Sequence, residues 1–454
     1  MCQQNYLCNV PNSSFPCIYI YLTLYYKLKH ESIAIAKLKD NMEGFDDEIE
    51  EPVSPTGQYL NSSSLSVCIL GVLESEIPMD DKQTMSLLQD VFLPINTRFS
   101  SIMIKDQNGE KKWRKVDVKL EEHVNIPKFP TCKSSSLYNE YMSTIAREHL
   151  PQNRPLWEIH IIKYPTKNAA GTLVFKLHHA LGDGYSLMGA LLSCLERADN
   201  PSLPFTLPSS QRPKTNFNIS SVSFSMNCIK EVKSRLRVST NDVIAGLIFF
   251  GIRLYMHQMN QDSSKYQSTA LVLLNTRNIS GYNSVKEMVD IKNNNKNSIW
   301  GNQFAFLHVS IPELCGKKIE NPLEFIWEAH KEINRKKNSL ATPLTGMVLN
   351  MVKKLRGPEA TARFVYNTLR NSSTTISNII GPVEQMALAN HPVKGLYFMV
   401  VGPPESLTIT IMSYMGKLRI AFGLEKDFID KQKFISCMES SLEMIITAAR
   451  KISK

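Results

Sequence analysis

The stretch His178-His179-Ala180-Leu181-Gly182-Asp183-Gly184 decides how the rest of this 454-residue sequence is interpreted. Residues 171–177 before it are apolar and β-branched, which predicts a buried strand. Residues 185–195 after it have the spacing of a helix. The two histidines therefore lie where a strand ends and the chain turns into a helix. Catalytic groups are common at such turns, because the scaffold is rigid and the side chain is exposed.

The residue types in this turn suit proton transfer. An imidazole titrates near neutral pH, so it can take a proton from a hydroxyl and return it to a leaving group. Asp183 can brace the turn through backbone amides or a neighbouring arginine without contacting a substrate. The glycines at 182 and 184 are expected to permit backbone angles that other residues resist. A pair of structural core histidines is the alternative, but it does not explain Asp and Gly at fixed offsets, so we interpret the stretch as catalytic.

Four segments resemble the motifs of one family, in the right order. They are the HHxxxDG stretch itself, Pro155-Leu156-Trp157-Glu158 (PLWE), Asn241-Asp242 (ND) and Ser377-Asn378-Ile379-Ile380-Gly381-Pro382 (SNxxGP). From about residue 51 to near its C-terminus, the chain resembles the plant-type wax ester synthase/diacylglycerol acyltransferase family. That family is part of the CoA-dependent acyltransferase superfamily, with chloramphenicol acetyltransferase and peptide-synthetase condensation domains.

The resemblance implies a fold and a reaction. The expected fold is α/β, with two similarly folded halves as in chloramphenicol acetyltransferase and an active-site tunnel between them. The expected enzyme is an O-acyltransferase that moves a fatty acyl group from acyl-CoA to a long-chain alcohol, giving wax ester, or to diacylglycerol, giving triacylglycerol. His179 would be the general base, and the acyl group would pass directly, without a covalent enzyme intermediate.

The resemblance also assigns neighbours to this base. His178 is expected to be a packed or hydrogen-bonding neighbour, because general-base sites use a single imidazole. Asp183 would shape the site, with Arg277 of Asn275-Thr276-Arg277 as its candidate partner, and Gly184 would complete the turn. Trp157 is either a core residue or a support of the histidine turn.

The remaining motif residues keep two interpretations each. Asn241 and Asp242 could cap a helix, whereas the resemblance makes them supports of the active site. The oxyanion that forms on a thioester needs a hydrogen-bond donor. Ser377 and Asn378 are candidates for that donor, and the sequence does not decide between them.

Composition suggests four segments along the chain. Residues 1–41 are expected to be a disordered leader or a wrongly assigned start; the apolar run at 15–26 is too short to span a bilayer and could otherwise be an interfacial anchor. Residues 42–200 form the expected N-terminal domain, 201–218 a linker rich in Pro and Ser, and 219–454 the C-terminal domain. The linker is shorter than is usual in the family, so an inactive lipid-binding or scaffold protein is a rival hypothesis.

The charge and cysteine content limit the partners. The net charge of +10 suits an anionic partner such as CoA or an acidic membrane surface, and no nucleic-acid-binding signature is present. Nine scattered cysteines without ligand spacing predict neither a metal site nor a disulfide framework. Acyl-CoA, a fatty alcohol, diacylglycerol and a membrane surface are the expected partners, with no cofactor beyond acyl-CoA as co-substrate.

Two basic clusters bear on location. Residues 335–337 and 353–356 flank apolar helical stretches and are either solvated helix faces or docking sites for an anionic membrane. We expect a peripheral or weakly anchored protein on the cytosolic side of the endoplasmic reticulum or plasma membrane. An acyltransferase of small soluble alcohols is the rival enzyme, although the DFGWG segment of that plant family is absent.

Periodicity predicts elements on both sides of the linker. The predicted strands are 65–73, 100–105, 113–118, 156–162, 171–177, 219–226, 270–274, 303–311, 407–414 and 417–423, and the predicted helices are 81–92, 138–148, 185–195, 227–236, a core helix from 241 to about 250, 322–336 and 433–452. Residues 282–299 are predicted to be a polar loop.

Overall fold

The computed structural model describes residues 51–107, 110–129, 134–166, 168–207, 217–260, 266–277, 285, 288, 300–314, 321–426 and 428–452. They fall within one compact unit, Glu50–Lys454. The predicted leader, the middle of the predicted linker, residues 108–109 between two predicted strands, and nearly all of the predicted polar loop lie outside the described residues.

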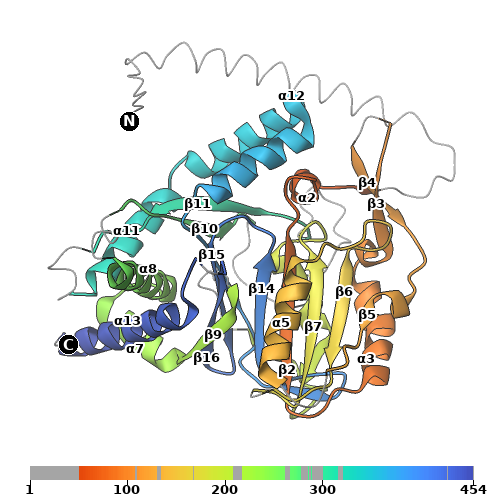
Figure 1. Cartoon of the computed structure of the whole chain (residues 1–454), viewed down its shortest axis with the longest axis horizontal. Helices are drawn as coiled ribbons and strands as arrows, with labels where there is room; N and C mark the ends of the chain where they lie inside the picture. Colours follow the sequence, from red (N-terminus) through yellow and green to blue (C-terminus); the bar gives the residue numbers. More distant parts are fainter. Residues whose placement is uncertain are drawn as a thin grey trace. The chain divides into compact units, whose positions relative to one another are not determined.

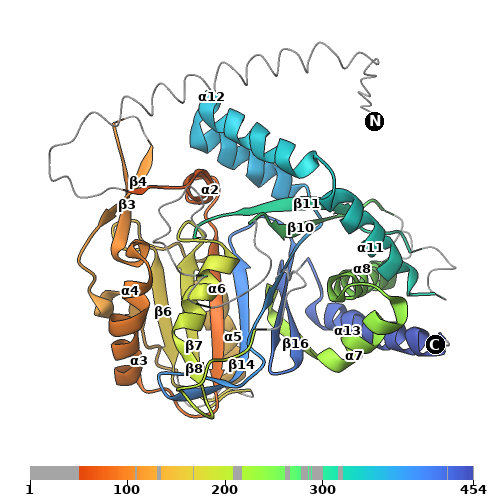
Figure 2. The same ribbon diagram turned by 180° about the vertical axis from the view of Figure 1, so that it is seen from behind.

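The first half of the unit is built on a seven-stranded sheet. Its strands, in spatial order, are β5 (Val124–Asn125), β6 (Trp157–Ile162), β7 (Gly171–His178), β2 (Cys68–Ser75), β14 (His391–Val401), β13 (Met386–Leu388) and β8 (Leu195–Arg197). Every residue of β2, β6 and β7 is buried, as their apolar sequences predict. Helix α5 (Ser134–Arg147) packs on one face (Figure 1), and α6 (Gly184–Ser193) packs on the other (Figure 2).

Short elements surround this sheet. They are β1 (Glu51–Pro52), β4 (Lys111–Lys115) and β3 (Ser101–Lys105), which form a three-stranded sheet, the helices α2 (Pro55–Leu60), α3 (Asp81–Leu87) and α4 (Leu93–Ile95), a π-helical turn at Leu88–Phe92, and 3₁₀ turns at Thr97–Ser100 and Leu120–Glu122. The predicted helix at 81–92 is thus confirmed, with its last turn widened.

The second half is built on a six-stranded sheet. Its order is β11 (Phe304–Ser310), β10 (Thr269–Asn275), β12 (Thr374–Ile380), β15 (Leu407–Tyr414), β16 (Lys417–Leu424) and β9 (Phe217–Ser225). Four helices pack on it, namely α7 (Met226–Leu236), α8 (Thr240–Met259), α11 (Glu324–Lys337) and α13 (Lys431–Lys451). Strands β13 and β14 leave this half and complete the first sheet, so the two halves share a sheet rather than merely touching (Figure 1).

Helix α8 begins with a capping box in which Ser239 and Asp242 exchange hydrogen bonds. Its apolar run is buried in the core, as predicted for residues 241–250. Within the described parts of the chain, no single helix has the length and hydropathy needed to cross a membrane; α7 and α8 reach it only as a pair bent by 103° at their junction.

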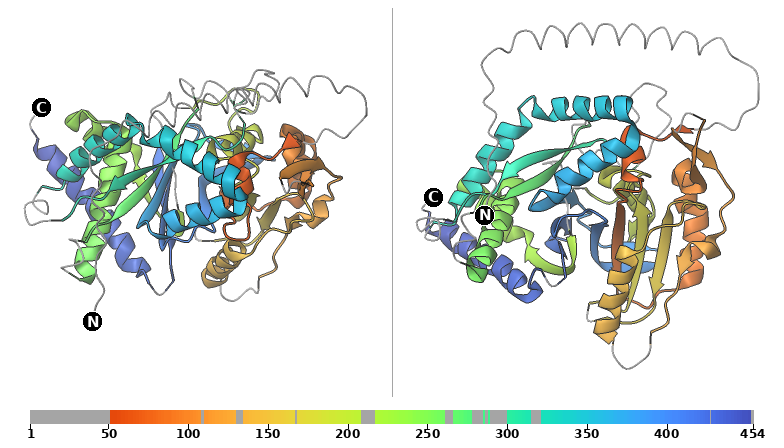
Figure 3. Two further views of the ribbon diagram at one scale, coloured as in Figure 1. Left: turned by 90° about the horizontal axis from the view of Figure 1, so that it is seen from above. Right: turned by 45° about the horizontal axis from the view of Figure 1, so that its top comes forward.

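Helix α12 (Ala341–Arg370) was not among the predicted helices, and the sequence indicated only apolar helical stretches next to residues 335–337 and 353–356. It consists of two segments that meet at Gly357, whose φ of 81° is non-helical, and at Pro358. Figure 3 shows the two segments at an angle to each other beyond β11. A glycine followed by a proline is an ordinary helix break, and this one redirects the second segment across the sheet.

Candidate active site

The histidine turn lies where β7 ends and α6 begins. The backbone N–H of His179 donates to the carbonyl of Val67 at 2.8 Å, which fixes the turn against the segment directly before β2. Asp183 is the N-cap of α6, and its side chain accepts from the N–H of Ser186. The strand-to-helix turn predicted from the sequence is therefore present, and it is held from both ends.

Asn302, from the second half, determines the tautomer of His179. The Nδ2 of Asn302 donates to the backbone carbonyl of His179 at 2.9 Å, so its Oδ1 is the atom 2.8 Å from the ring Nδ1. A carbonyl oxygen can only accept, so Nδ1 carries the proton. The lone pair is then on Nε2, which is the form a general base requires.

Both histidines are buried and both are neutral at pH 7. Burial lowers the pKa of His179 below its ordinary value of 6.5, although Asp183 and the hydrogen bond to Asn302 act in the opposite direction. Burial, together with the repulsion between the two rings when both are protonated, lowers the pKa of His178 to about 3. Neutral imidazoles can accept protons, so the state of His179 suits the role predicted for it.

His178 is a hydrogen-bonding neighbour, in the place predicted for it. Its Nδ1 accepts from the N–H of Ala180 at 3.1 Å, and its Nε2 lies 3.2 Å from the hydroxyl of Ser66. Both ring nitrogens are therefore occupied, and the side chain has no exposed surface.

The predicted ion pair between Asp183 and Arg277 is present. Arg277 contacts the carboxylate through both terminal nitrogens, at 2.6 and 2.9 Å. The N–H groups of Ser186 and Gln303 also donate to it, at 3.2 and 2.9 Å. With both partners buried and four donors on the carboxylate, Asp183 holds the second half against the histidine turn and does not face a substrate.

The segment 300–303 completes this junction. Gly301 has a φ of 119°, in the region that favours glycine, and its carbonyl accepts from Arg277 at 2.7 Å. Trp300 donates through its Nε1 to the carbonyl of Leu181 at 2.9 Å. These bonds deliver Asn302 to the ring of His179.

The explanation predicted for the two glycines of the motif is wrong. Neither Gly182 nor Gly184 has a positive φ. Instead, an added Cβ at Gly184 would lie 2.8 Å from Ile379 of β12, and one at Gly182 would lie 2.9 Å from Ser186. The close approach of α6 accounts for glycine at position 182, whereas at Gly184 the nearest atom is the terminal methyl group of Ile379, which can rotate away.

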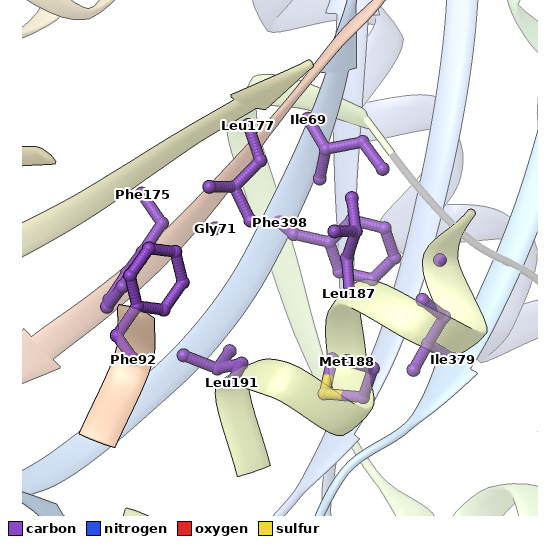
Figure 4. Close-up of a pocket in the computed structure, with 11 residues that line it drawn as sticks. Ile69, Gly71, Phe92, Phe175, Leu177, Leu187, Met188, Leu191, Ile379 and Phe398 are labelled. Atoms are coloured by element: carbon purple, nitrogen blue, oxygen red, sulfur yellow. The ribbon is translucent and has the colours of Figure 1, made fainter. Parts of the chain in front are cut away.

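Two cavities adjoin the histidine turn, where the resemblance implied one tunnel. The smaller, of about 30 Å³, is entirely lined by apolar side chains and glycines, among them Leu177, Gly184 and Ile379. Figure 4 shows it enclosed between the sheet and α6, with Phe92 and Phe175 at one end. The larger, of about 640 Å³, lies under α12 and is lined by Phe304, whose ring packs 5.4 Å from that of His179. His179 itself lines neither cavity: the smaller one meets the turn at Leu177 and Gly184, and the larger one is linked to the imidazole through Phe304.

The two candidate oxyanion donors lie on opposite faces of β12. Asn378 donates to the Oδ1 of Asn241 at 3.2 Å, on the face covered by α8. Ile379, one residue on, reaches the small cavity at Gly184. Because side chains alternate along a strand, Ser377 shares the face of Ile379, towards the histidine turn.

The other motif residues lie in structural positions. Asp242 caps α8 and lies 2.8 Å from the Nδ1 of His330. Trp157 is fully buried and donates to the carbonyl of Phe99 at 2.8 Å. The capping interpretation of Asp242 and the core interpretation of Trp157 therefore describe their surroundings.

Sequence reasoning did not find Asn302. Its signal was weak but present: Trp300-Gly301-Asn302-Gln303 is a compact polar and aromatic segment directly before a predicted strand. Among the residues that the structure describes, no group of three or more His, Cys, Asp or Glu could hold a metal ion.

Comparison with known proteins agrees with this geometry. Residues 81–238 match the wax ester synthase/diacylglycerol acyltransferase catalytic domain, and residues 300–446 match the C-terminal domain of the same family. The chain is 25% identical to wax ester synthase/diacylglycerol acyltransferase 4 of Arabidopsis thaliana, over 91% of this chain and 93% of that protein. It is also 25% identical to wax ester synthase/diacylglycerol acyltransferase 5 of the same plant, over 88% of this chain and 94% of that protein.

Solved structures share the fold. The wax ester synthase/diacylglycerol acyltransferase of Marinobacter aquaeolei VT8 superposes with a TM-score of 0.60 at 18% identity, over 88% of this chain and 100% of that one. The starter condensation domain of rhizomide synthetase superposes with a TM-score of 0.52 at 11% identity, over 89% of this chain and 95% of that one. The predicted two-domain acyltransferase fold is therefore confirmed. With its two domain matches covering about two thirds of its length, this chain belongs to the wax ester synthase/diacylglycerol acyltransferase family of acyltransferases.

Proposed function

We propose that this acyltransferase esterifies a long-chain alcohol or diacylglycerol with the fatty acyl group of acyl-CoA, using His179 as general base. The observation that carries the proposal is the pair of hydrogen bonds from Asn302, which leaves the lone pair of a neutral imidazole on Nε2. Phe304, whose ring packs on that imidazole, lines the large cavity. Both acceptors carry a hydroxyl group on a molecule with long hydrocarbon chains, so one base and one site can serve both.

The reaction needs one proton shuttle. Nε2 of His179 takes the proton of the acceptor hydroxyl while that oxygen attacks the thioester carbonyl carbon. When the tetrahedral intermediate collapses, the carbon–sulfur bond breaks and the imidazolium returns the proton to the CoA sulfur. The ester and free CoA leave, and the direct transfer uses acyl-CoA as co-substrate with no other cofactor.

We propose supporting roles for four further residues. Asn302 positions the base by holding its Nδ1–H. Asp183 and Arg277 keep the histidine turn and segment 300–303 together. Ser377 is the better placed of the two oxyanion candidates, since the side chain of Asn378 is engaged with Asn241.

We also propose that the protein works at the cytosolic surface of the endoplasmic reticulum or plasma membrane, as a peripheral protein. Its lipid substrates reside in membranes, and its net charge of +10 favours an anionic surface.

An acceptor-competition assay tests this function. Purified protein receives labelled palmitoyl-CoA with hexadecanol, with diacylglycerol, or with both, and the products are separated by chromatography. We expect labelled wax ester, triacylglycerol or both. Esterification of only short soluble alcohols would point to the rival enzyme, and folded protein without turnover would point to a lipid-binding or scaffold role.

A further inference from the structure

The first segment of α12 exposes an apolar face to solvent. Its large apolar side chains, from 39% to 76% exposed, are Leu340, Leu344, Met347, Val348, Met351 and Leu355. At 100° per residue, these positions fall within an arc of about 100° on one side of the helix. A contiguous exposed stripe of this kind marks an interaction surface, whereas single exposed apolar residues do not.

The opposite side of the same segment lines the large cavity. Thr345, Gly346 and Leu349 face it, together with Phe364 and Leu369 from the second segment. Phe304 extends the lining to the ring of His179. One helix therefore separates an exposed apolar face from the space beside the candidate base.

The charge around this face favours an anionic surface. Residues 331–370 contain nine Lys or Arg and two Glu. Lys354 and Arg356, near the end of the stripe, are exposed, as are Arg335 and Lys337 before it. Apolar side chains on one face flanked by basic residues are the pattern of a helix that lies in a membrane interface.

We propose that residues 340–356 dock on an anionic lipid bilayer with this apolar stripe inserted, and that the cavity beneath is the entrance for the membrane-borne acceptor. The entrance rests on the proposed function; the docking does not. The acceptor would leave the bilayer beside α12 and reach His179 past Phe304, without crossing water.

Vesicle flotation tests the docking. The full-length protein is mixed with vesicles of phosphatidylcholine alone or with 30% phosphatidylserine. The triple variant Leu344→Gln/Val348→Gln/Met351→Gln should bind about 100- to 1,000-fold more weakly, since each side chain is worth about five- to tenfold. The matched control is Ile77→Gln/Leu203→Gln/Val383→Gln, which should bind like the unmutated protein. The three control side chains are 44%, 47% and 50% exposed, and the three side chains changed in the stripe are 49%, 48% and 51% exposed.

A second pair of substitutions tests the charge. Lys354→Gln/Arg356→Gln should weaken binding to the phosphatidylserine vesicles about fivefold per charge, with less effect on neutral ones. Unchanged vesicle binding by the triple variant would overturn the docking. So would a dimer of the unmutated protein that the triple variant converts to monomer without any vesicle binding, because a second copy would then cover the stripe.

The entrance has its own test. Leu349→Trp fills part of the cavity from the inner face of α12. It should bind vesicles like the unmutated protein but lose at least tenfold in ester formation from acceptor in those vesicles. Equal activity would overturn the entrance, whereas absence of ester from the unmutated protein would count against the proposed function and leave the docking result standing.

Discussion

Asn302→Ala is the variant that most specifically tests how the base is held. It removes two hydrogen bonds, at 2.8 Å to the ring Nδ1 and 2.9 Å to the carbonyl of His179. Each contributes about 1 kcal/mol, so the barrier should rise by about 2 kcal/mol and kcat should fall roughly 30-fold. KM for palmitoyl-CoA should change little, because these bonds position the imidazole and do not bind the substrate.

The pH dependence separates positioning from a general loss of structure. His179 works only while neutral, so activity falls as the pH drops through its pKa. Burial lowers that pKa, so the acidic limb of the unmutated enzyme should lie below pH 6.5. Asn302→Asp places a carboxylate beside Nδ1, which raises the pKa of the imidazole and should move the limb to higher pH.

The assay is formation of labelled palmityl ester from hexadecanol, followed by chromatography between pH 5 and 8. Asn227→Ala, a substitution at an exposed position in α7, is the control and should behave like the unmutated enzyme. An Asn302→Ala enzyme with normal kcat, or an Asn302→Asp enzyme whose acidic limb has not moved, would refute the assignment of the tautomer.

Three further predictions concern stability, measured by urea unfolding. Asp183→Asn leaves the buried Arg277 without its counter-charge and should cost about 3–5 kcal/mol. Gly246→Ala places a Cβ 2.6 Å from the backbone of α11 and should cost about 1–3 kcal/mol, whereas Gly346→Ala, with nothing within 4 Å, should stabilise by up to about 1 kcal/mol. His178 has a folded-state pKa of about 3 against 6.5 unfolded, so it should cost about 2 kcal/mol of stability at pH 5, lost as the pH falls below 6.5; His178→Gln should remove this part of the slope and leave the part due to other buried histidines such as His160.

The aspartate variant has a matched control at the protein surface. Asp199→Asn, at an exposed ion pair with Arg197, should leave the midpoint unchanged. A similar effect of both aspartate variants would contradict the special place of Asp183. Equal costs for the two glycine variants, or an acid slope in His178→Gln as steep as in the unmutated protein, would contradict the packing and burial arguments.

Much of the fold could be predicted because its strands are long, apolar and regularly spaced. The runs that became β6, β7 and the β15–β16 hairpin needed no tertiary information, and the histidine turn followed from them. The ion pair of Asp183 with Arg277 was expected only through the resemblance to a family, since the two residues are 94 positions apart.

The remainder depended on tertiary structure. Asn302 is 123 positions from His179, and no local pattern marks an amide that reaches that far. The crossing of β13 and β14 into the first sheet is also invisible in sequence, because an apolar strand pairs equally well with either sheet. The extent of helix α12 was missed because Gly357-Pro358 interrupts it, and because its apolar stripe, although it has helical spacing, faces solvent and not a core.

The most direct test of the central claim compares His179→Ala with His178→Ala and the unmutated protein in the ester assay at pH 7. If Nε2 of His179 takes the acceptor's proton, His179→Ala should lower the rate of ester formation by about 10²–10⁴, and folded His178→Ala protein should retain a clearly higher rate. Ester formation by folded His179→Ala protein at the unmutated rate would contradict the account.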